Sequence, residues 1–474
     1  KPAPFNETNI PFKPRHHFPI SLKGIAQGVF TMVFGYPGSI EQYLHARALE
    51  DLLENVDPHR IALRKVRLEI LDMAMQENSE IKIQYTSKYA RIANYYKKWI
   101  GERWGLTKFG ALQSKYGEEA QFAKWASKGK RKKEYGSLMQ DFHAIYDQRE
   151  GLTQVQNYRM EAILGIEIMQ LANQLTKLEA IPESGPQRDR VLQALKNYAE
   201  KFFKDYHAPT DKKVFEALLT AYQKNIHEDF QTTEIRTPAK EFTELFDASI
   251  LTNEAEILKI VEDPSEENLS ILLNDEVYSM YKEFELMYEH SVAPGIKETN
   301  LELEKLYRKY VTGLREMHKR KSFYPDANST LRISYGIVDG YQPLDAVSYR
   351  YYTTIDGIME KYVADDKDFD LPEKIIELYD TKEYGRYITS DGDLPVCFIA
   401  SNHTTGGNSG SPVLNADGHL IGINFDRSWE STMSDYHYDP AICRNIAVDT
   451  RYILFIIDKY AGAGYLLEEM TIIK

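Results

Sequence analysis

Patterns of apolar and polar residues divide this chain into three stretches. Residues 1–40 contain an apolar run, 28–35, that is typical of a β-strand and is followed by a turn at 35–38. Apolar residues then recur at helical spacing from 41 to 327, and short alternating or apolar runs indicate strands again from 328 to 474. We therefore expect an α+β chain whose middle stretch is a large helical domain.

The middle stretch predicts irregular helices with one buried face each, since no fixed-period repeat occurs. Four apolar residues at positions i, i+3, i+4 and i+7 form the first such face: Leu49, Leu52, Leu53 and Val56. Similar spacing predicts helices over 61–75, 161–178, 188–203 and 301–317. Segments 181–186 and 293–295, which contain proline and glycine, are predicted to connect helices.

The last stretch predicts strands around a glycine-rich loop. An alternating run at 330–336 and an apolar run at 395–400 precede the loop. After the loop, 412–414 and 419–425 are predicted to form a β-hairpin, because Asn415-Ala416-Asp417-Gly418 is a turn sequence. Residues 450–460 return to helical spacing.

The loop itself, Gly406-Gly407-Asn408-Ser409-Gly410-Ser411, is typical of the nucleophile loop of a serine peptidase. Glycines beside Ser409 allow a tight turn, in which the N–H groups of Gly407 and Ser409 can stabilise an oxyanion. The nucleophile also needs a histidine base and a carboxylate that orients it. An ordinary glycine-rich β-turn could have the same sequence, but the strands predicted on both sides of the loop favour the peptidase interpretation.

The spacing after Ser409 predicts a substrate pocket for an acidic side chain. In chymotrypsin-like folds the pocket wall lies almost twenty residues after the nucleophile, which here is the segment 426–429. Arg427 could pair with a substrate carboxylate through two parallel hydrogen bonds. The alternative is a surface arginine paired with Asp426. His403 and Thr404 could assist at the pocket floor, or His403 could be purely structural.

Charge and composition narrow the classes of partner. The 58 Lys and Arg residues against 71 Asp and Glu residues give a formal net charge of −13, which disfavours nucleic acid or an anionic membrane as the main partner. The basic run 128–133 is predicted to be a solvated helix end. No stretch is apolar enough to predict membrane insertion, and no metal-ligand or phosphate-loop motif predicts a cofactor. Cys397 and Cys443 could be free or bridged.

Several motifs resemble bacterial dipeptidyl peptidases of the 7/11 type, in particular the Asp/Glu-specific type 11. They are spread over the whole chain and comprise 30–38, 89–97, 407–413, 422–430, 444–446 and 465–467. The resemblance implies a chymotrypsin-like double β-barrel with an inserted helical domain, and release of dipeptides from free N-termini. It implies that Asp426 and Asn94 bind the substrate amine, and that Arg427 binds Asp or Glu at P1.

One departure from the family pattern concerns the base. The family's catalytic histidine lies in a Thr-Asn-His-His-Cys-like motif, which this chain lacks; His16 and His17 are followed by Phe-Pro and do not fit it. We therefore expect a fragment that lacks the catalytic His and Asp and is inactive alone. Its domains would be the end of a mostly missing first barrel (1–40), the helical domain (41–327) and the second barrel with a C-terminal helix (328–474).

Two other functions remain open at this stage: a glutamyl endopeptidase, and a non-catalytic helical interaction protein. An endopeptidase needs no amine anchor, so cleavage of an N-acetylated peptide would separate it from a dipeptidyl peptidase. The resemblance further implies a homodimer and a periplasmic or cell-surface location in Gram-negative bacteria. The sequence does not indicate which side chain is preferred at P2, the N-terminal residue of the released dipeptide.

Overall fold

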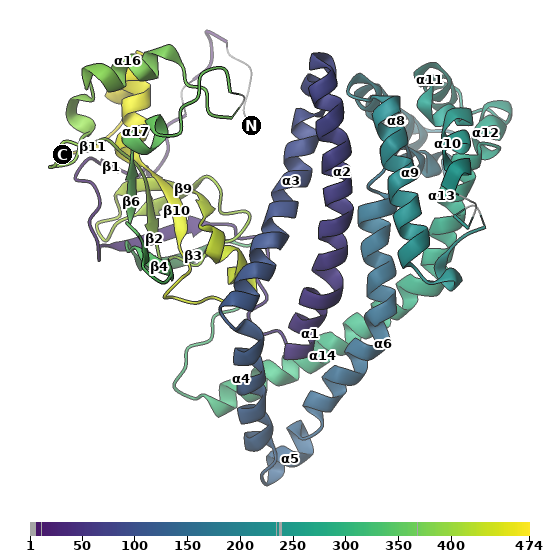
Figure 1. Ribbon diagram of the computed structural model, residues 1–474, viewed down its shortest axis with the longest axis horizontal. Coiled ribbons are helices and arrows are strands. Elements are labelled where there is room, and N and C mark those ends of the chain that lie inside the picture. Colours follow the sequence, from purple (N-terminus) through teal and green to yellow (C-terminus); the bar gives the residue numbers. More distant parts are fainter. Residues whose placement is uncertain (1–5, 11, 234, 237–238, 367) are drawn as a thin grey trace. The chain divides into compact units, whose positions relative to one another are not determined.

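The computed structural model describes residues 6–10, 12–233, 235–236, 239–366 and 368–474 (Figure 1). The chain divides into two compact units, which we call the sheet unit and the helical unit. The sheet unit consists of residues 1–42 together with 324–474, and the helical unit consists of residues 43–323. Helix and strand are therefore mixed in the chain but largely separated between the units, as expected for an α+β protein.

The sheet unit contains eleven strands in its described residues. They are β1 (Ile20–Ser21), β2 (Phe30–Gly35), β3 (Arg332–Ile337), β4 (Tyr341–Leu344), β5 (Val347–Tyr349), β6 (Tyr352–Thr354), β7 (Pro395–Ala400), β8 (Ser411–Leu414), β9 (Leu420–Arg427), β10 (Asn445–Asp449) and β11 (Ile472–Ile473). Nine of them form one sheet. Seven follow the order β3-β2-β8-β9-β10-β7-β6, β1 joins this path through β9, and β11 pairs with β1. A bridge between Val338 and Ala400 links the end of β3 back to β7.

Strand β2 lies in the apolar run that was predicted to be a strand at 28–35. Its residues pair antiparallel with β3 from Phe30–Ile337 to Gly35–Arg332, and Val33 also pairs with Val413 of β8. The segment 1–40 therefore contributes a strand to the sheet that carries the serine loop. Val33 is fully buried in the core beneath the sheet, and this burial fixes the strand's register.

The predicted hairpin after the serine loop is confirmed. β8 and β9 pair antiparallel, and the Asn415 N–H donates to the His419 carbonyl across the turn. The remaining helical segments of this unit are α15 (Ile355–Met359), α16 (Glu373–Thr381), η7 (Gly385–Tyr387), η8 (Trp429–Asp435), α17 (Thr450–Phe455), η9 (Ile456–Tyr460) and η10 (Gly464–Glu469). Segments α17 and η9 together confirm the helix predicted at 450–460.

The helical unit begins with three consecutive segments, α1 (Ala46–Asp51), η1 (Leu52–Val56) and α2 (Asp57–Glu77), and α2 packs along α3 (Ser79–Lys108). The other segments before the second half are α4 (Ala111–Ala126), α5 (Lys130–Tyr135), α6 (Leu138–Tyr158), η2 (Arg159–Ile163), α7 (Glu167–Leu175), η3 (Thr176–Leu178) and α8 (Pro186–Lys204). They are followed by α9 (Ala208–Asn225), η4 (Glu228–Phe230), α10 (Ala239–Ala248), η5 (Ile250–Thr252), α11 (Glu254–Glu262), α12 (Glu266–Leu273), α13 (Glu276–Met287), η6 (Tyr288–Val292) and α14 (Ala293–Met317).

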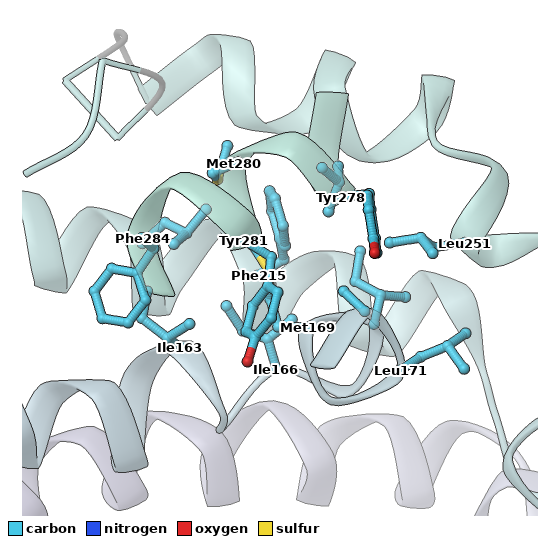
Figure 2. Packing of buried hydrophobic residues seen from close by; sticks show 14 of the residues in the cluster. Ile163, Ile166, Met169, Leu171, Phe215, Leu251, Tyr278, Met280, Tyr281 and Phe284 are labelled. Atoms are coloured by element: carbon cyan, nitrogen blue, oxygen red, sulfur yellow. The ribbon is translucent and has the colours of Figure 1, made fainter. Parts of the chain in front are cut away.

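Buried aliphatic and aromatic side chains hold the second half of the helical unit together. Figure 2 shows part of this core, in which Phe215, Tyr281 and Phe284 lie among Ile163 and Met169. Tyr281 and Phe284 are each 1% exposed. Truncating such a side chain typically costs about 3–5 kcal/mol, so this core anchors the unit.

Two helix predictions need correction. The helix predicted over 161–178 is interrupted at 164–166, because the buried Asp211 carboxylate accepts hydrogen bonds from the N–H groups of Glu167 and Ile168 (2.9 and 3.0 Å) and so starts a new helix. The connection predicted at 293–295 is helical instead, because Pro294 occupies the first turn of α14, where its missing N–H costs nothing. Among the described residues, no helix is both long and apolar enough to cross a membrane.

Candidate active site

The serine loop connects β7 to β8, and a second turn of the sheet unit supports it. Gly407 has a φ of +100°, and a Cβ atom there would lie 2.4 Å from the carbonyl oxygen of Tyr36. The Gly38 N–H donates to the Gly406 carbonyl (2.7 Å). The turn after β2 is therefore in direct contact with the serine loop, and only glycine fits at position 407.

Buried asparagines fix the shape of the loop. The Asn408 side-chain oxygen accepts a hydrogen bond from the Thr405 N–H (3.1 Å), and the Asn424 amide donates to the Asn408 carbonyl (3.2 Å). Asn445 in turn donates to the Asn424 side-chain oxygen (2.8 Å). All three asparagines are at most 3% exposed, so their hydrogen bonds are made in a water-poor environment where they hold the loop firmly.

Two N–H groups of the loop are not used in this network. The N–H groups of Asn408, Gly410 and Ser411 donate to backbone carbonyls. In the described chain the N–H groups of Gly407 and Ser409 have no recorded acceptor. These are the two donors that the sequence assigned to an oxyanion, and they are available for that task.

The Ser409 hydroxyl is exposed and donates to the carbonyl of Phe425 (3.1 Å). That carbonyl is accessible because β9 bulges: Asp426 pairs with Ile446 and Asn424 pairs with Ala447, which leaves Phe425 without a partner on β10. A carbonyl oxygen cannot take the hydroxyl proton as a base would. In this arrangement Ser409 is therefore positioned but not activated.

Arg427 follows two residues after Phe425 on the same strand, so its side chain starts within about 7 Å of the carbonyl that binds Ser409. Its guanidinium does not pair with the Asp426 carboxylate, as the surface alternative supposed. It forms two parallel hydrogen bonds with Asp435 (2.6 and 3.0 Å) and a third with the Ser434 hydroxyl (3.0 Å). The side chains of Arg427 and Asp435 are 11% and 8% exposed, so this is a nearly buried ion pair.

His403 lies beside this pair and has structural partners. Its Nε2 contacts the Ser434 carbonyl (2.8 Å), and its ring stacks on Tyr438 with centroids 4.7 Å apart. Burial lowers the pKa of His403. These contacts support the structural role of His403, whereas the carbonyl of Thr404 accepts a long bond from Arg427 (3.5 Å).

The predicted amine anchors lie in different units. Asp426 is exposed on β9 of the sheet unit, and its carboxylate accepts the Arg427 N–H (2.8 Å). Asn94 is exposed on α3 of the helical unit. Their shared role in binding the substrate amine stays a prediction.

None of the histidines considered as a base contacts Ser409 in the described residues. His17 contacts the Thr471 hydroxyl (2.8 Å), and His16 lies against the rings of His17 and Phe18. Both cysteines are free: burial raises the pKa of Cys397 and that of Cys443 to about 11, so neither thiol is ionised at neutral pH. The described residues contain no group of three or more metal-ligating side chains.

Sequence reasoning missed Asp435, the asparagines around the loop and the supporting role of the turn at 35–38. The asparagines carried a usable signal, because Asn424 interrupts an otherwise apolar strand and asparagine is rare in strands. No pattern in the sequence linked Asp435 to Arg427, because Asp435 lies eight residues after Arg427 and on a separate short helix.

Comparisons with known proteins match this chain from end to end. The family described as Peptidase S46 matches residues 1–472. The Asp/Glu-specific dipeptidyl-peptidase of Capnocytophaga gingivalis is 41% identical over 481 residues, which is 100% of this chain and 67% of that protein. Dipeptidyl-peptidase 7 of Phocaeicola vulgatus is 36% identical over 487 residues, which is 100% of this chain and 67% of that protein.

A solved structure agrees with these matches. The crystal structure of Porphyromonas endodontalis DPP11 in complex with the dipeptide Arg-Glu has a TM-score of 0.85 and 32% identity, covering 99% of this chain and 68% of that one. The chain thus spans about two thirds of the length of these relatives. The matches give no support to the expectation that the chain is a fragment, and that expectation stays a prediction.

Proposed function

This chain belongs to the Peptidase S46 family and is a serine peptidase, and we propose that it releases N-terminal dipeptides from peptides with Asp or Glu at P1. The observation that carries this proposal is the position of Arg427, close to Ser409 and on the strand that binds the serine hydroxyl. The names of the relatives support it, since several are Asp/Glu-specific dipeptidyl-peptidases. The proposed substrate is an oligopeptide with a free N-terminus.

In the proposed reaction Ser409 Oγ attacks the carbonyl carbon of the P1 residue and forms an acyl-enzyme. The N–H groups of Gly407 and Ser409 then donate to the oxyanion, and loss of one such donor typically costs about 3–4 kcal/mol of transition-state stabilisation. The amide bond after P1 breaks, and the base gives the proton it took from Ser409 to the amine that leaves as the N-terminus of the shortened peptide. Water then hydrolyses the ester of the acyl-enzyme, which releases the dipeptide and restores the Ser409 hydroxyl. A base must first take the Ser409 proton, and we propose that this base is a histidine.

The P1 side chain is proposed to bind Arg427. The guanidinium is already held flat by Asp435 and Ser434, so it does not have to be ordered when the substrate arrives. Two carboxylates would then share one guanidinium. A P1 carboxylate would form charge-assisted hydrogen bonds with the guanidinium, whereas the uncharged amide of Gln at P1 cannot and should bind less tightly.

The free N-terminus is proposed to bind the exposed carboxylate of Asp426, with Asn94 as a second contact. An ammonium group opposite a carboxylate gains charge-assisted hydrogen bonds that an acetylated N-terminus cannot make. A chymotrypsin-like double barrel, a homodimer and a periplasmic or cell-surface location are further proposals, and they rest on the family resemblance.

The proposal is tested with fluorogenic peptides and the purified protein. We expect release of the reporter from Xaa-Glu and Xaa-Asp peptides with free N-termini, and little release from Xaa-Gln or Xaa-Leu peptides. Acetylation of the N-terminus should remove this activity. Cleavage that persists after acetylation would instead indicate an endopeptidase, and equal rates with Glu and Gln would exclude Arg427 as the P1 determinant.

A further inference from the structure

Two basic runs come together at one end of the helical unit. The first run contains Lys128 and the four cationic residues 130–133 of α5, and the second contains the cationic residues 319–321, which follow α14. Figure 1 shows α5 at this end of the unit, and α5 and the end of α4 pack against α14. We call these eight residues the basic end: Lys128, Lys130, Arg131, Lys132, Lys133, Lys319, Arg320 and Lys321.

A hollow of about 710 Å³ joins the two runs, because Trp125 lines it together with residues 316–321. The guanidinium carbon of Arg131 lies 4.7 Å from the centre of the Trp125 ring, which places the first run beside the same hollow. Trp125 and Met317 both pack against the core formed by α4, α6 and α14. The folded core thus fixes two runs that are almost 190 residues apart in the sequence as one surface.

The charges of this surface are not neutralised within the chain. Among the described residues, none of the eight cations of the basic end is in an ion pair. Lysines elsewhere in the unit do pair, for example Lys196 with Glu262 and Lys212 with Asp247. The carboxylates that adjoin the two runs, Glu134 and Glu316, lie near the hydroxyl of Tyr135.

The net charge of −13 does not cancel this local field. Charges more than about 8–10 Å away are screened at physiological salt, so a ligand at the basic end experiences mainly the eight cations and the two adjoining carboxylates of Glu134 and Glu316, a local excess of positive charge. The solvated helix end that the sequence predicted for 128–133 is therefore only half of a larger charged surface.

The chemistry of the surface favours a lipid headgroup over nucleic acid. Six of the eight cations are lysines, which act as flexible point charges and suit a diffuse layer of phosphate groups rather than paired recognition of one group. The aromatic ring in the hollow is covered by Arg131 and packed on the core, so it cannot stack with a base. We propose that the basic end binds the surface of a lipid layer that carries phosphate headgroups.

Vesicle sedimentation with the whole 474-residue chain tests this proposal. We expect the chain to sediment with phosphatidylcholine vesicles that contain about 30% phosphatidylglycerol, and to be released at about 0.5 M salt. Replacing Lys128, Lys130, Lys132 and Lys133 by Gln should reduce the partition coefficient at least about tenfold. A matched control replaces four exposed lysines of the same unit by Gln, namely Lys201, Lys204, Lys297 and Lys305, and should bind like the parent chain.

Unchanged thermal unfolding of both variants would show that they are folded. The proposal is overturned if the basic-end variant binds the anionic vesicles as well as the control does. It is also overturned if the parent chain ignores the vesicles, or if a DNA duplex of equal phosphate concentration displaces it from them and is bound more tightly. Hydrolysis of reporter peptides is not part of this readout, so the proposed function and this inference can fail separately.

Discussion

At the scale of single residues, the pairing of Arg427 with Asp435 determines how the pocket is built. An isolated arginine in a half-buried pocket would be costly to desolvate, and Asp435 offsets that cost with two short charge-assisted hydrogen bonds. The same bonds fix the plane of the guanidinium. The residue proposed to set the P1 specificity therefore depends on a partner that the sequence did not reveal.

Replacing Arg427 by Gly should consequently change both specificity and stability. We expect kcat/KM for Glu at P1 to fall at least about a hundredfold, because the charge partner of the substrate is lost. The buried Asp435 carboxylate would lose the two hydrogen bonds that the guanidinium donates, which should destabilise the protein by about 3–5 kcal/mol. Reporter kinetics on the gene-encoded protein and urea unfolding measure the two effects.

The double substitution Arg427→Gly with Asp435→Asn separates them. It should recover much of the lost stability without recovering cleavage after Glu, because the buried negative charge that Arg427 balanced is gone but the P1 partner is still absent. The substitution of an exposed acid of the same unit, Asp391→Asn, serves as the control. If the single and double variants unfold at the same urea concentration, the ion pair does not have the role assigned to it.

At the scale of elements, much of the fold could be predicted from local patterns. The strand at 395–400, the hairpin around Asp417-Gly418 and the helix starting at Thr450 follow from alternation, turn chemistry and helical spacing. The strand pairing of β2 could not be predicted, because its partners β3 and β8 are hundreds of residues away in the sequence. The apolar residues of β2 show that it is a strand but do not show which strand lies beside it. The bulge at Phe425 was likewise hidden, since an irregular register has no period to detect.

The start of α2 gives a prediction that depends on pH. Asp57 is fully buried there, and neither carboxylate oxygen accepts a hydrogen bond in the described chain. Burial is the main cause that raises the pKa of Asp57 to about 8, and the negative charge of Glu102 is the second. The positive charges of Arg60, Lys98 and Arg103 oppose this shift but do not cancel it. The folded state then holds the proton more tightly than the unfolded state, so stability should fall as the pH rises from about 4 to about 8.

The substitution Asp57→Asn should reduce the change in the free energy of unfolding between about pH 4 and about pH 8. One titrating group contributes at most about 1.4 kcal/mol per pH unit to this slope, so the gain in stability of the variant should be largest at about pH 8. Urea unfolding at several pH values between these limits measures the slope. Glu77→Gln, at the exposed end of the same helix, should leave the slope of the parent chain intact. An equally steep fall in the stability of the Asp57→Asn variant would contradict the buried-carboxylate explanation.

At the scale of the whole molecule, the catalytic prediction concerns what the 474 residues can do by themselves. The recorded partner of the Ser409 hydroxyl is a backbone carbonyl, and no described histidine contacts it. We expect the protein to bind a dipeptide that ends in Glu in this arrangement, because binding of the product needs no base. Calorimetry measures the binding, and a fluorogenic assay measures turnover. If turnover occurs, alanine substitutions at His16, His17 and His403 would identify the base.

The long separation of β2 from β3 has a consequence for how the protein is made. Roughly 300 residues lie between these paired strands, so at a synthesis rate of about 5–20 residues per second β2 waits about 15–60 s for its neighbour. Folding of the intervening helices would bring the flanking residues Ser39 and Asn328 to their observed bridge. Closing a loop of about 10 rather than 300 residues saves about 3 kcal/mol of chain entropy. The order of events during synthesis is thus helices first and serine loop last, so an incomplete chain cannot carry an assembled nucleophile.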